Sequence, residues 1–496
     1  MKNILKITLL VIISYSCNNI NSKSEIEGLW ISTEETSPKF SSGIQKAVIQ
    51  FNHNQNGELE ARGIFLWNGE YGYEWRLEKV QYDETTHTLT INDADGDTYI
   101  GVFDYKNKRI YGAVHLKDAE PGNQNDSLNL IPADKNLETK LLYPRVSDKN
   151  GKLDYSYSAP EQLEDGLQTE SINDNNNINS DSLISLINKI IGQEYGRIES
   201  LLILKDYKLM VEEYFYGYDR TQLHKIHSCT KSITSLLLGI SLNNHNNVNV
   251  EQSIFNFFPE YNSLKNEENE IITLKNTLTM TAGFQWDEYP KEMYETNDWF
   301  QYILTRPMES NPGKKFTYNS GCSILLGGVI NFLEHKYAQF YAEEVLFGPL
   351  GISEYTWETH KNGAPQCGGG LQLLPRNMAK IGLLVLNNGK WQDKQIIPEE
   401  WIYESTIPHT SESDYFDYGY QWWLRSKNTK QWWNETETTD EFDMIVALGW
   451  GGQRIIIVKE LNLVVVTTGS NYENNMEPST FPMVIEKIIP AIINNK

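Results

Sequence analysis

The sequence has few cysteines, and their spacing excludes two kinds of cross-linked site. There are four cysteines in 496 residues, and three remain after Cys17, namely Cys229, Cys322 and Cys367. An odd number of thiols at irregular spacing is neither a disulfide framework nor a zinc site. We therefore expect these three to be buried small apolar residues. Cys229 and Cys322 lie close in sequence to candidate catalytic residues, so they could line a site without reacting.

The sequence also has no block of basic residues and no internal repeat. Acidic residues outnumber basic ones 66 to 43, and the formal net charge is −23. A surface of this sign repels nucleic acid and anionic lipid headgroups, so we expect neither as a partner. The length is sufficient for two or three domains, at least one with a substantial core.

The apolar stretch at the N-terminus is too short to span a bilayer as a permanent helix. Lys2 and Lys6 precede apolar residues 7–13, and small residues lead to Cys17. This pattern predicts a secretory signal peptide over residues 1–17. Its end resembles a bacterial lipoprotein signal, although Ser14 departs from the usual residue, and a plain cleaved signal is the alternative. We expect an exported, membrane-anchored lipoprotein of a bacterial cell envelope, lipidated at Cys17, on the periplasmic or cell-surface side.

Residues 25–134 are predicted to form a small all-β domain. Short stretches rich in β-branched and aromatic residues alternate with turn formers. These stretches are residues 46–51, 59–66, 88–91, 99–105 and 109–116. Regular short strands with tight turns favour a meander closed into a small barrel or half-barrel. The sequence leaves open whether this domain binds a ligand.

The rest of the chain is predicted to contain a linker and a mixed domain. Residues 135–182 are polar and irregular, which indicates a linker or an arm across the surface. In 183–496, helical and strand patterns follow one another. They include a helix over 182–191, a hairpin over 200–215, strands at 454–458 and 463–468, and a helix over 482–493. This order predicts an α+β fold with an antiparallel sheet flanked by helices.

The pair Ser228 and Lys231 forms the one S-x-x-K motif of the chain. At the start of a helix, a spacing of three residues places both side chains on one face. A buried lysine with a lowered pKa can take the proton of a serine hydroxyl, or stabilise another base that does. The helix N-terminus adds a positive field where an oxyanion would form. The structural alternative is a helix cap followed by a solvated lysine, but the apolar helix 233–242 argues against it.

Two further segments carry candidate residues. A Pro-Gly turn at 312–313 precedes Tyr318, and a tyrosine can act as a base beside cations that favour its phenolate. Gly451 and Gly452 permit close approach of backbone to a substrate, and the following strand could present an N–H to an oxyanion. Taken alone, each segment is more simply explained as a turn.

In order and spacing, these segments resemble the β-lactamase-related serine hydrolases. That superfamily includes class C β-lactamases, DD-peptidases, family VIII carboxylesterases and 6-aminohexanoate-dimer hydrolases. The resemblance runs from about residue 155 to the C-terminus. Besides the residues above, it rests on four segments: 272–284, 349–352, 374–380 and 418–423.

The resemblance implies roles for individual residues. Ser228 would be acylated, Lys231 would activate it, and Tyr318 would shuttle protons. The backbone N–H of Gln453, after Gly451 and Gly452, would complete an oxyanion hole with that of Ser228. Ser320 would orient Lys231. The implied partner is a small-molecule ester, amide or peptide-like substrate, and neither a cofactor nor a metal is required.

One departure from the family pattern bears on the substrate. The usual Lys-Thr-Gly or His-x-Gly third motif is absent, and Trp450-Gly451-Gly452 is similar to the corresponding motif of family VIII esterases. Loss of that cation weakens docking of a substrate carboxylate and removes a charge that would lower the pKa of Tyr318. Arg454 could compensate if its side chain reached the site. The sequence therefore favours ester or amide hydrolysis over dedicated β-lactamase activity.

Other interpretations remain. A non-catalytic ligand-binding or sensor protein of the cell envelope, on a penicillin-binding fold, would also tolerate the altered third motif. The function could instead lie in the N-terminal domain.

The aromatic segment 415–433 could line an acyl pocket or belong to the core. His224, His227 and Glu288 show no metal-ligand spacing, so structural roles are favoured for them.

Overall fold

The computed structural model divides into two compact units, one of residues 1–70 and 74–134 and one of residues 71–73 and 135–496. The residues it describes are 25–33, 45–54, 56–67, 70–117, 125–134, 142–145, 155–175, 178–288, 290–431, 433, 440–472 and 480–493. The predicted signal peptide and its Cys17 lie outside them. Among the helices in these ranges, none combines the length and apolar character that crossing a membrane requires.

The N-terminal unit is built on one ten-stranded sheet in the order β4-β3-β2-β1-β10-β8-β7-β6-β5, with β9 paired to β8. The pairings between these strands are antiparallel. The strands are β1 (Gly28–Ser32), β2 (Gln45–His53), β3 (Leu59–Trp67), β4 (Glu70–Trp75), β5 (Leu77–Asp83), β6 (Thr88–Asp93), β7 (Thr98–Asp104), β8 (Arg109–His115), β9 (Asn125–Ser127) and β10 (Leu130–Pro132).

The sheet of this unit is nearly closed on itself. Strands β4 and β5 are its two edges, yet Arg76 alone separates them in sequence. The sheet must therefore curl until its edges approach, and β3 indeed contacts β5. Side chains alternate accordingly: on β7, Tyr99 and Phe103 are buried whereas Ile100 and Val102 face outward. The predicted barrel-like all-β domain is confirmed.

The C-terminal unit contains a nine-stranded sheet in the order β11-β13-β12-β24-β23-β22-β21-β20-β19. Its pairings are antiparallel except for the parallel pair of β11 with β13. The strands are β11 (Gln168–Thr169), β12 (Ile198–Lys205), β13 (Lys208–Tyr214), β19 (Thr410–Ser411), β20 (Asp417–Tyr418), β21 (Trp423–Arg425), β22 (Met444–Gly449), β23 (Gln453–Val458) and β24 (Leu463–Gly469).

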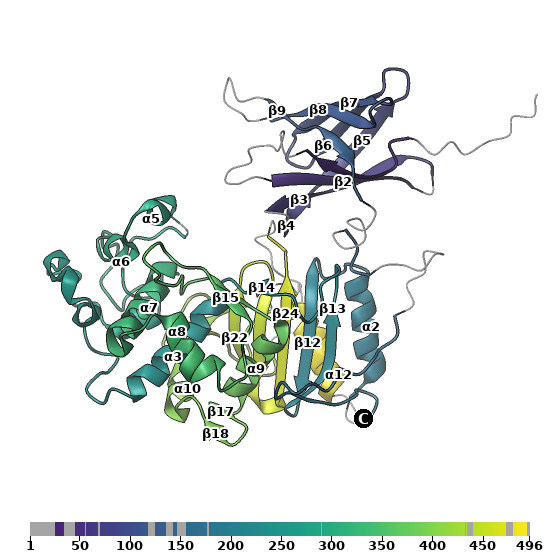
Figure 1. Ribbon diagram of the computed structural model, residues 1–496. Helices are drawn as coiled ribbons and strands as arrows, with labels where there is room; N and C mark the ends of the chain where they lie inside the picture. The colour runs from purple at the N-terminus through teal and green to yellow at the C-terminus, as the bar shows by residue number, and fades with distance from the viewer. Residues whose placement is uncertain are drawn as a thin grey trace, which may run out of the picture. The chain divides into compact units, whose positions relative to one another are not determined.

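Helices cover both faces of this sheet (Figure 1). Helices α2 (Ser180–Ile191) and α12 (Ile489–Ile493) share one core with Ile456 of β23, and α3 (Cys229–Asn243) and α9 (Pro375–Leu386) share the other with Ile455. The remaining helices and short strands are α4 (Leu274–Leu278), α5 (Lys291–Glu295), α6 (Trp299–Leu304), α7 (Ser320–Glu334), α8 (Ala338–Ala342), α10 (Glu399–Ser405), α11 (Thr480–Met483), η2 (Ile254–Phe257), η3 (Pro259–Leu264), η4 (Glu343–Phe347), η5 (Lys459–Leu461), η6 (Val484–Ile488), β14 (His224–Lys225), β15 (Tyr355–Trp357), β16 (Leu371–Leu373), β17 (Lys390–Trp391) and β18 (Lys394–Gln395). The predicted α+β fold with an antiparallel sheet flanked by helices is confirmed.

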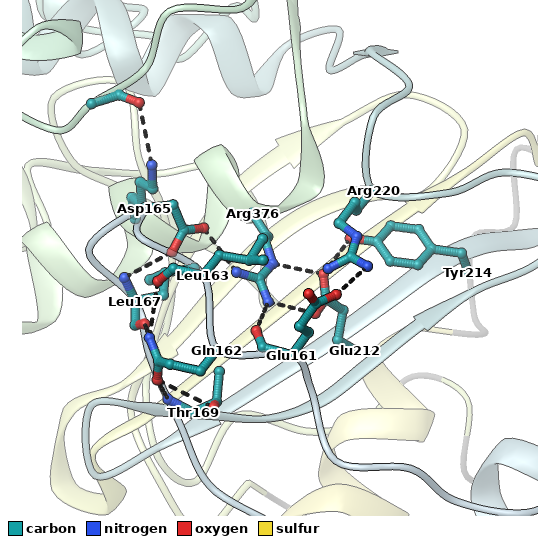
Figure 2. A network of polar contacts seen from close by, with 12 residues as sticks. Glu161, Gln162, Leu163, Asp165, Leu167, Thr169, Glu212, Tyr214, Arg220 and Arg376 are labelled. Atoms are coloured by element: carbon teal, nitrogen blue, oxygen red, sulfur yellow. Dashed lines mark hydrogen bonds and ion pairs between the residues drawn. The ribbon is translucent and has the colours of Figure 1, made fainter.

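A polar anchor holds part of the segment that the sequence assigned to a linker or arm. In this segment, β11 extends the sheet beyond β13, and Leu167 is buried. Arg376 of α9 donates two hydrogen bonds of 2.7 Å to Glu212 and one of 2.8 Å to Asp165 (Figure 2). It also donates to the carbonyl oxygen of Glu161 at 2.8 Å. Charged hydrogen bonds therefore attach the arm in addition to strand pairing and burial of Leu167, and an argument from apolar content does not detect them.

Candidate active site

Ser228 lies at the N-terminus of α3, where the chain leaves β14. It is the N-cap residue of this helix, but its side chain makes no capping hydrogen bond. The hydroxyl is therefore available to another partner, and Lys231 Nζ lies 2.9 Å from Ser228 Oγ. Ser228 is 8% exposed and Lys231 is 1% exposed. The structure thus brings the two residues of the S-x-x-K motif together in a nearly water-free position.

Burial of α3 changes the chemistry of Lys231. Each residue of the helix from Cys229 to Ser241 is buried, so the solvated lysine of the structural alternative is excluded. Desolvation lowers the pKa of Lys231 to about 8, and the negative charge of Glu288 opposes part of that shift. A substantial fraction of the amine is therefore neutral near pH 8, and a neutral amine can accept a proton.

Two further groups hold the amine of Lys231. Its Nζ lies 2.9 Å from Ser320 Oγ and 2.5 Å from the carbonyl oxygen of Gly368. Ser320 is the first residue of α7, which Asn319 caps by accepting a hydrogen bond of 3.2 Å from the N–H of Cys322.

Tyr318 comes from the loop just before α7. Lys231 Nζ is 4.8 Å from the centroid of its ring. The ring also packs against Trp423 of β21, with centroids 5.6 Å apart. Tyr318, Ser320 and Lys231 are therefore neighbours, as the resemblance implied.

The turn between β22 and β23 lies beside the nucleophile segment. Gly451 and Gly452 have φ of 83° and 100°, in the left-handed region where glycine is favoured. Cys229 Sγ is 3.5 Å from the carbonyl oxygen of Gln453. The side-chain amide of Gln453 donates to Gly469 O at 2.5 Å and to Trp450 O at 3.2 Å, and so braces the turn.

An aromatic group lies at the turn between β22 and β23. Trp450, 43% exposed, packs against Tyr472 with ring centroids 4.6 Å apart, and His227 lies 5.6 Å from both. A side chain at Gly451 would come within 2.3 Å of the Tyr472 ring, so glycine is required there. Burial, and then the charges of nearby lysines, lower the pKa of His227 to about 3. The imidazole of His227 is therefore uncharged at neutral pH.

Arg454 does not replace the cation. Its side chain is 0% exposed, and Nη1 donates to the carbonyl oxygens of Gly449 at 2.5 Å and Gln453 at 2.7 Å. The guanidinium thus supports the backbone of the turn from within the protein, and no part of it reaches solvent.

Sequence reasoning missed two residues that contact this constellation. Glu288, for which a structural role was favoured, accepts hydrogen bonds from the N–H and hydroxyl of Ser320 at 2.7 and 2.6 Å. Gly368, whose carbonyl accepts from Lys231, was not considered. The run of three glycines at 368–370 is a signal that could have drawn attention to it.

Other candidate residues are placed elsewhere. His224 pairs with buried Glu199 at 3.3 Å. Burial raises the pKa of the Cys229 thiol to about 12, so it remains protonated. The three described cysteines are buried and free. Within the described ranges there is no group of His, Cys, Asp and Glu side chains that could hold a metal ion.

Residues 196–479 match the family model described as Beta-lactamase. In sequence, the chain is similar to "Protein flp" of Staphylococcus aureus: it is 26% identical over 174 residues to that of strain MW2, covering 32% of this chain and 34% of the relative. For strain MRSA252 the values are 25% over 178 residues, 33% and 35%. This chain therefore spans about a third of the length of these curated relatives.

The structure is similar to that of a "putative beta-lactamase" from Bacteroides dorei. The TM-score is 0.53 at 16% identity, covering 64% of this chain and 99% of the other, which shows the fold. A "putative 6-aminohexanoate-dimer hydrolase" from Bacillus anthracis gives a TM-score of 0.49 at 22% identity, covering 59% and 79% of the two chains.

Proposed function

Because this chain belongs to the Beta-lactamase family, we propose that it is a serine hydrolase that cleaves an ester or amide bond through an acyl-enzyme on Ser228. The observation that carries this proposal is the hydrogen bond of 2.9 Å between Ser228 Oγ and the buried amine of Lys231. A hydroxyl needs an adjacent base to become a nucleophile. A lysine whose pKa is lowered to about 8 is such a base.

In the proposed reaction, Lys231 and Tyr318 act as general acid and base. As Ser228 Oγ bonds to the substrate carbonyl carbon, its proton passes to the neutral amine of Lys231. The bond from that carbon to the leaving group then breaks, and the leaving oxygen or nitrogen receives the proton by way of Tyr318. A water molecule next attacks the acyl-enzyme, gives its proton to the same pair, and releases the acid and Ser228.

The negative charge on the tetrahedral oxygen needs donors in place before the reaction. The N-terminus of α3 supplies the backbone N–H of Ser228 and a positive field. The N–H of Gln453 is the proposed second donor. The positive φ of Gly451 and Gly452 and the side-chain bonds of Gln453 hold that residue beside Cys229.

The surroundings of the nucleophile favour an uncharged acyl group. Trp450 and Tyr472 present aromatic surface beside His227, the residue before Ser228. Trp423 packs against Tyr318, whose ring lies beside Lys231. Neutral His227 and enclosed Arg454 offer no cation to a substrate carboxylate there. We therefore propose neutral esters or amides, aryl or alkyl, as the substrate class.

The same absence of a third-motif cation favours a second candidate, a cell-envelope protein that binds a ligand without turning it over. Turnover of short-chain nitrophenyl esters tests the choice. We expect saturable hydrolysis that Ser228→Ala abolishes. A folded wild-type protein with no turnover of any ester or amide would favour the binding protein.

We further propose that the protein is exported and anchored to the envelope by lipid on Cys17. Growth with an alkyne-bearing fatty acid should label the wild-type protein but not Cys17→Ser, which should appear in the soluble fraction. An unlabelled wild-type protein would favour a plain cleaved signal peptide.

A further inference from the structure

Glu288 binds Ser320 through both of its carboxylate oxygens. Oε1 accepts the backbone N–H of Ser320 at 2.7 Å, and Oε2 accepts the hydroxyl at 2.6 Å. Oε1 also accepts a hydrogen bond of 3.1 Å from Trp286 Nε1. Ser320 is the first residue of the 15-residue helix α7, so the carboxylate also lies at a helix N-terminus, where negative charge is stabilised.

These contacts fix the direction of the Ser320 hydroxyl. A serine hydroxyl has one proton to donate and lone pairs to accept with. Because the proton goes to the Glu288 carboxylate, the oxygen faces Lys231 Nζ, 2.9 Å away, as an acceptor. The other partner of Lys231 is the carbonyl oxygen of Gly368, 2.5 Å away, which can accept a hydrogen bond but cannot donate one.

A count of protons then determines how neutral Lys231 faces Ser228. A neutral amine has two N–H bonds and one lone pair. The two N–H bonds are directed to Ser320 Oγ and Gly368 O, so the lone pair remains for the hydroxyl of Ser228. If the Ser320 hydroxyl turned round, it would donate to the amine and compete with Ser228 for that lone pair.

We propose that Glu288 is a positioning residue that acts through Ser320 to keep the lone pair of Lys231 directed at Ser228 Oγ. This inference rests on the proposed function, in which Lys231 is the base. Glu288 touches neither reacting atom, and its effect is transmitted through one hydroxyl group.

The charge of Glu288 also reaches its neighbours on other elements. It stabilises the protonated form of Lys231, so it opposes the lowering of that pKa by burial. Cys322 on α7, Tyr294 on α5 and Tyr418 on β20 also lie within its field, and burial raises the pKa of each. These three groups are uncharged near neutral pH. Of the four groups named, Lys231 is therefore the one whose protonation the charge of Glu288 changes in that pH range.

Glu288→Gln tests the proposal, with Glu295→Gln as the matched control. The amide can donate to Ser320 Oγ and turn its hydroxyl toward Lys231. Glu295 is an exposed glutamate of the next helix, paired with Lys291 at 3.5 Å. We expect kcat for a nitrophenyl ester to fall at least about tenfold in Glu288→Gln, because a misdirected general base loses part of its contribution to the rate. KM should change less than about twofold.

The acid limb of the pH–kcat profile should move to lower pH in Glu288→Gln, because a negative charge that favours protonated Lys231 has been removed. In a Ser320→Ala background, Glu288→Gln should cause no further loss of kcat, because the transmitting hydroxyl is gone. Glu295→Gln should match the wild type in each measurement.

The outcome is separable from that of the proposed function. If wild type and Glu288→Gln are labelled alike at Ser228 by a fluorophosphonate and share one kcat and one pH profile, the positioning role is overturned and the hydrolase stands. If Glu288→Gln loses kcat equally in the Ser320→Ala background, transmission through Ser320 is overturned. A wild-type protein that is not labelled would overturn the proposed function itself.

Discussion

Ser228 Oγ and Lys231 Nζ lie 2.9 Å apart within the first turn of a helix that is buried along most of its length. The spacing follows from helix geometry, since side chains three residues apart share a face. The lowered pKa follows from tertiary packing, because the sheet and α7 exclude water from the amine. Local sequence sets which two groups meet, and the rest of the fold sets what they can do.

The state of Lys231 predicts how activity depends on pH. Its pKa is lowered from 10.5 to about 8, so the amine is protonated below about pH 8 and neutral above it. Since the neutral form is the base, kcat/KM should rise about tenfold per pH unit below that midpoint and level off above it. Subtracting the rate with Ser228→Ala removes spontaneous hydrolysis. A rate that is flat from pH 5 to 9 would contradict this assignment.

Replacement of Lys231 tests the same base in another way. Lys231→Arg keeps a positive charge near Ser228 but removes the titratable amine, because the guanidinium remains protonated. We expect kcat to fall by about 10²- to 10⁴-fold, the usual contribution of a general base. Lys225→Arg, on the exposed side of the preceding strand, serves as a control and should retain activity. A Lys231→Arg variant as active as the wild type would exclude lysine as the base.

The exposed ring of Trp450 should contribute to recognition of aromatic acyl groups. An aromatic pair adds about 0.5–1.5 kcal/mol beyond burial, so Trp450→Ala should raise KM for an aryl ester about twofold to tenfold. An acetyl ester, which cannot reach the ring pair in the same way, should be affected less. Tyr403→Ala, which removes another exposed aromatic side chain, is the matched control. Equal effects on both esters would show that Trp450 is not part of the acyl site.

Arg376 should contribute strongly to the stability of the C-terminal unit. Arg376→Ala would leave the buried Glu212 carboxylate, and Asp165 beside it, without their cation. Removing one partner of a buried pair costs about 3–5 kcal/mol, measurable by urea unfolding followed by tryptophan fluorescence. Arg220→Ala removes an exposed pair with Glu161 at 2.5 Å and should cost less than about 1 kcal/mol. Equal losses in the two variants would show that the buried anchor has no special role.

Those features of the fold that depend on local pattern were predictable. Alternation of apolar and polar residues located β7 and β8, and periodicity located α2 and α3. The strands at which the N-terminal sheet closes could not be identified in the same way. They are β4 and β5, which are separated by a single residue. A linker or an arm was predicted over 135–182, but its anchor to Arg376 was not, since a salt bridge leaves no periodic trace in sequence.

The site was predictable to the extent that its residues belong to motifs. Ser228 and Lys231 follow from one helical turn, whereas Tyr318 and the turn at 450–453 became candidates through their family resemblance. Glu288 and Gly368 could not be assigned, because their contacts join positions 32 and 137 residues apart. The glycine run at 368–370 is the one local signal at either position, and Glu288 is exposed like many surface glutamates.

Intact-mass spectrometry of the purified full-length protein after exposure to a fluorophosphonate tests the central claim most directly. We expect a single adduct on the wild type, mapped by peptide sequencing to Ser228, and no adduct on Ser228→Ala. A folded wild-type protein without an adduct, or an adduct that persists in Ser228→Ala, would contradict the assignment of Ser228 as the nucleophile.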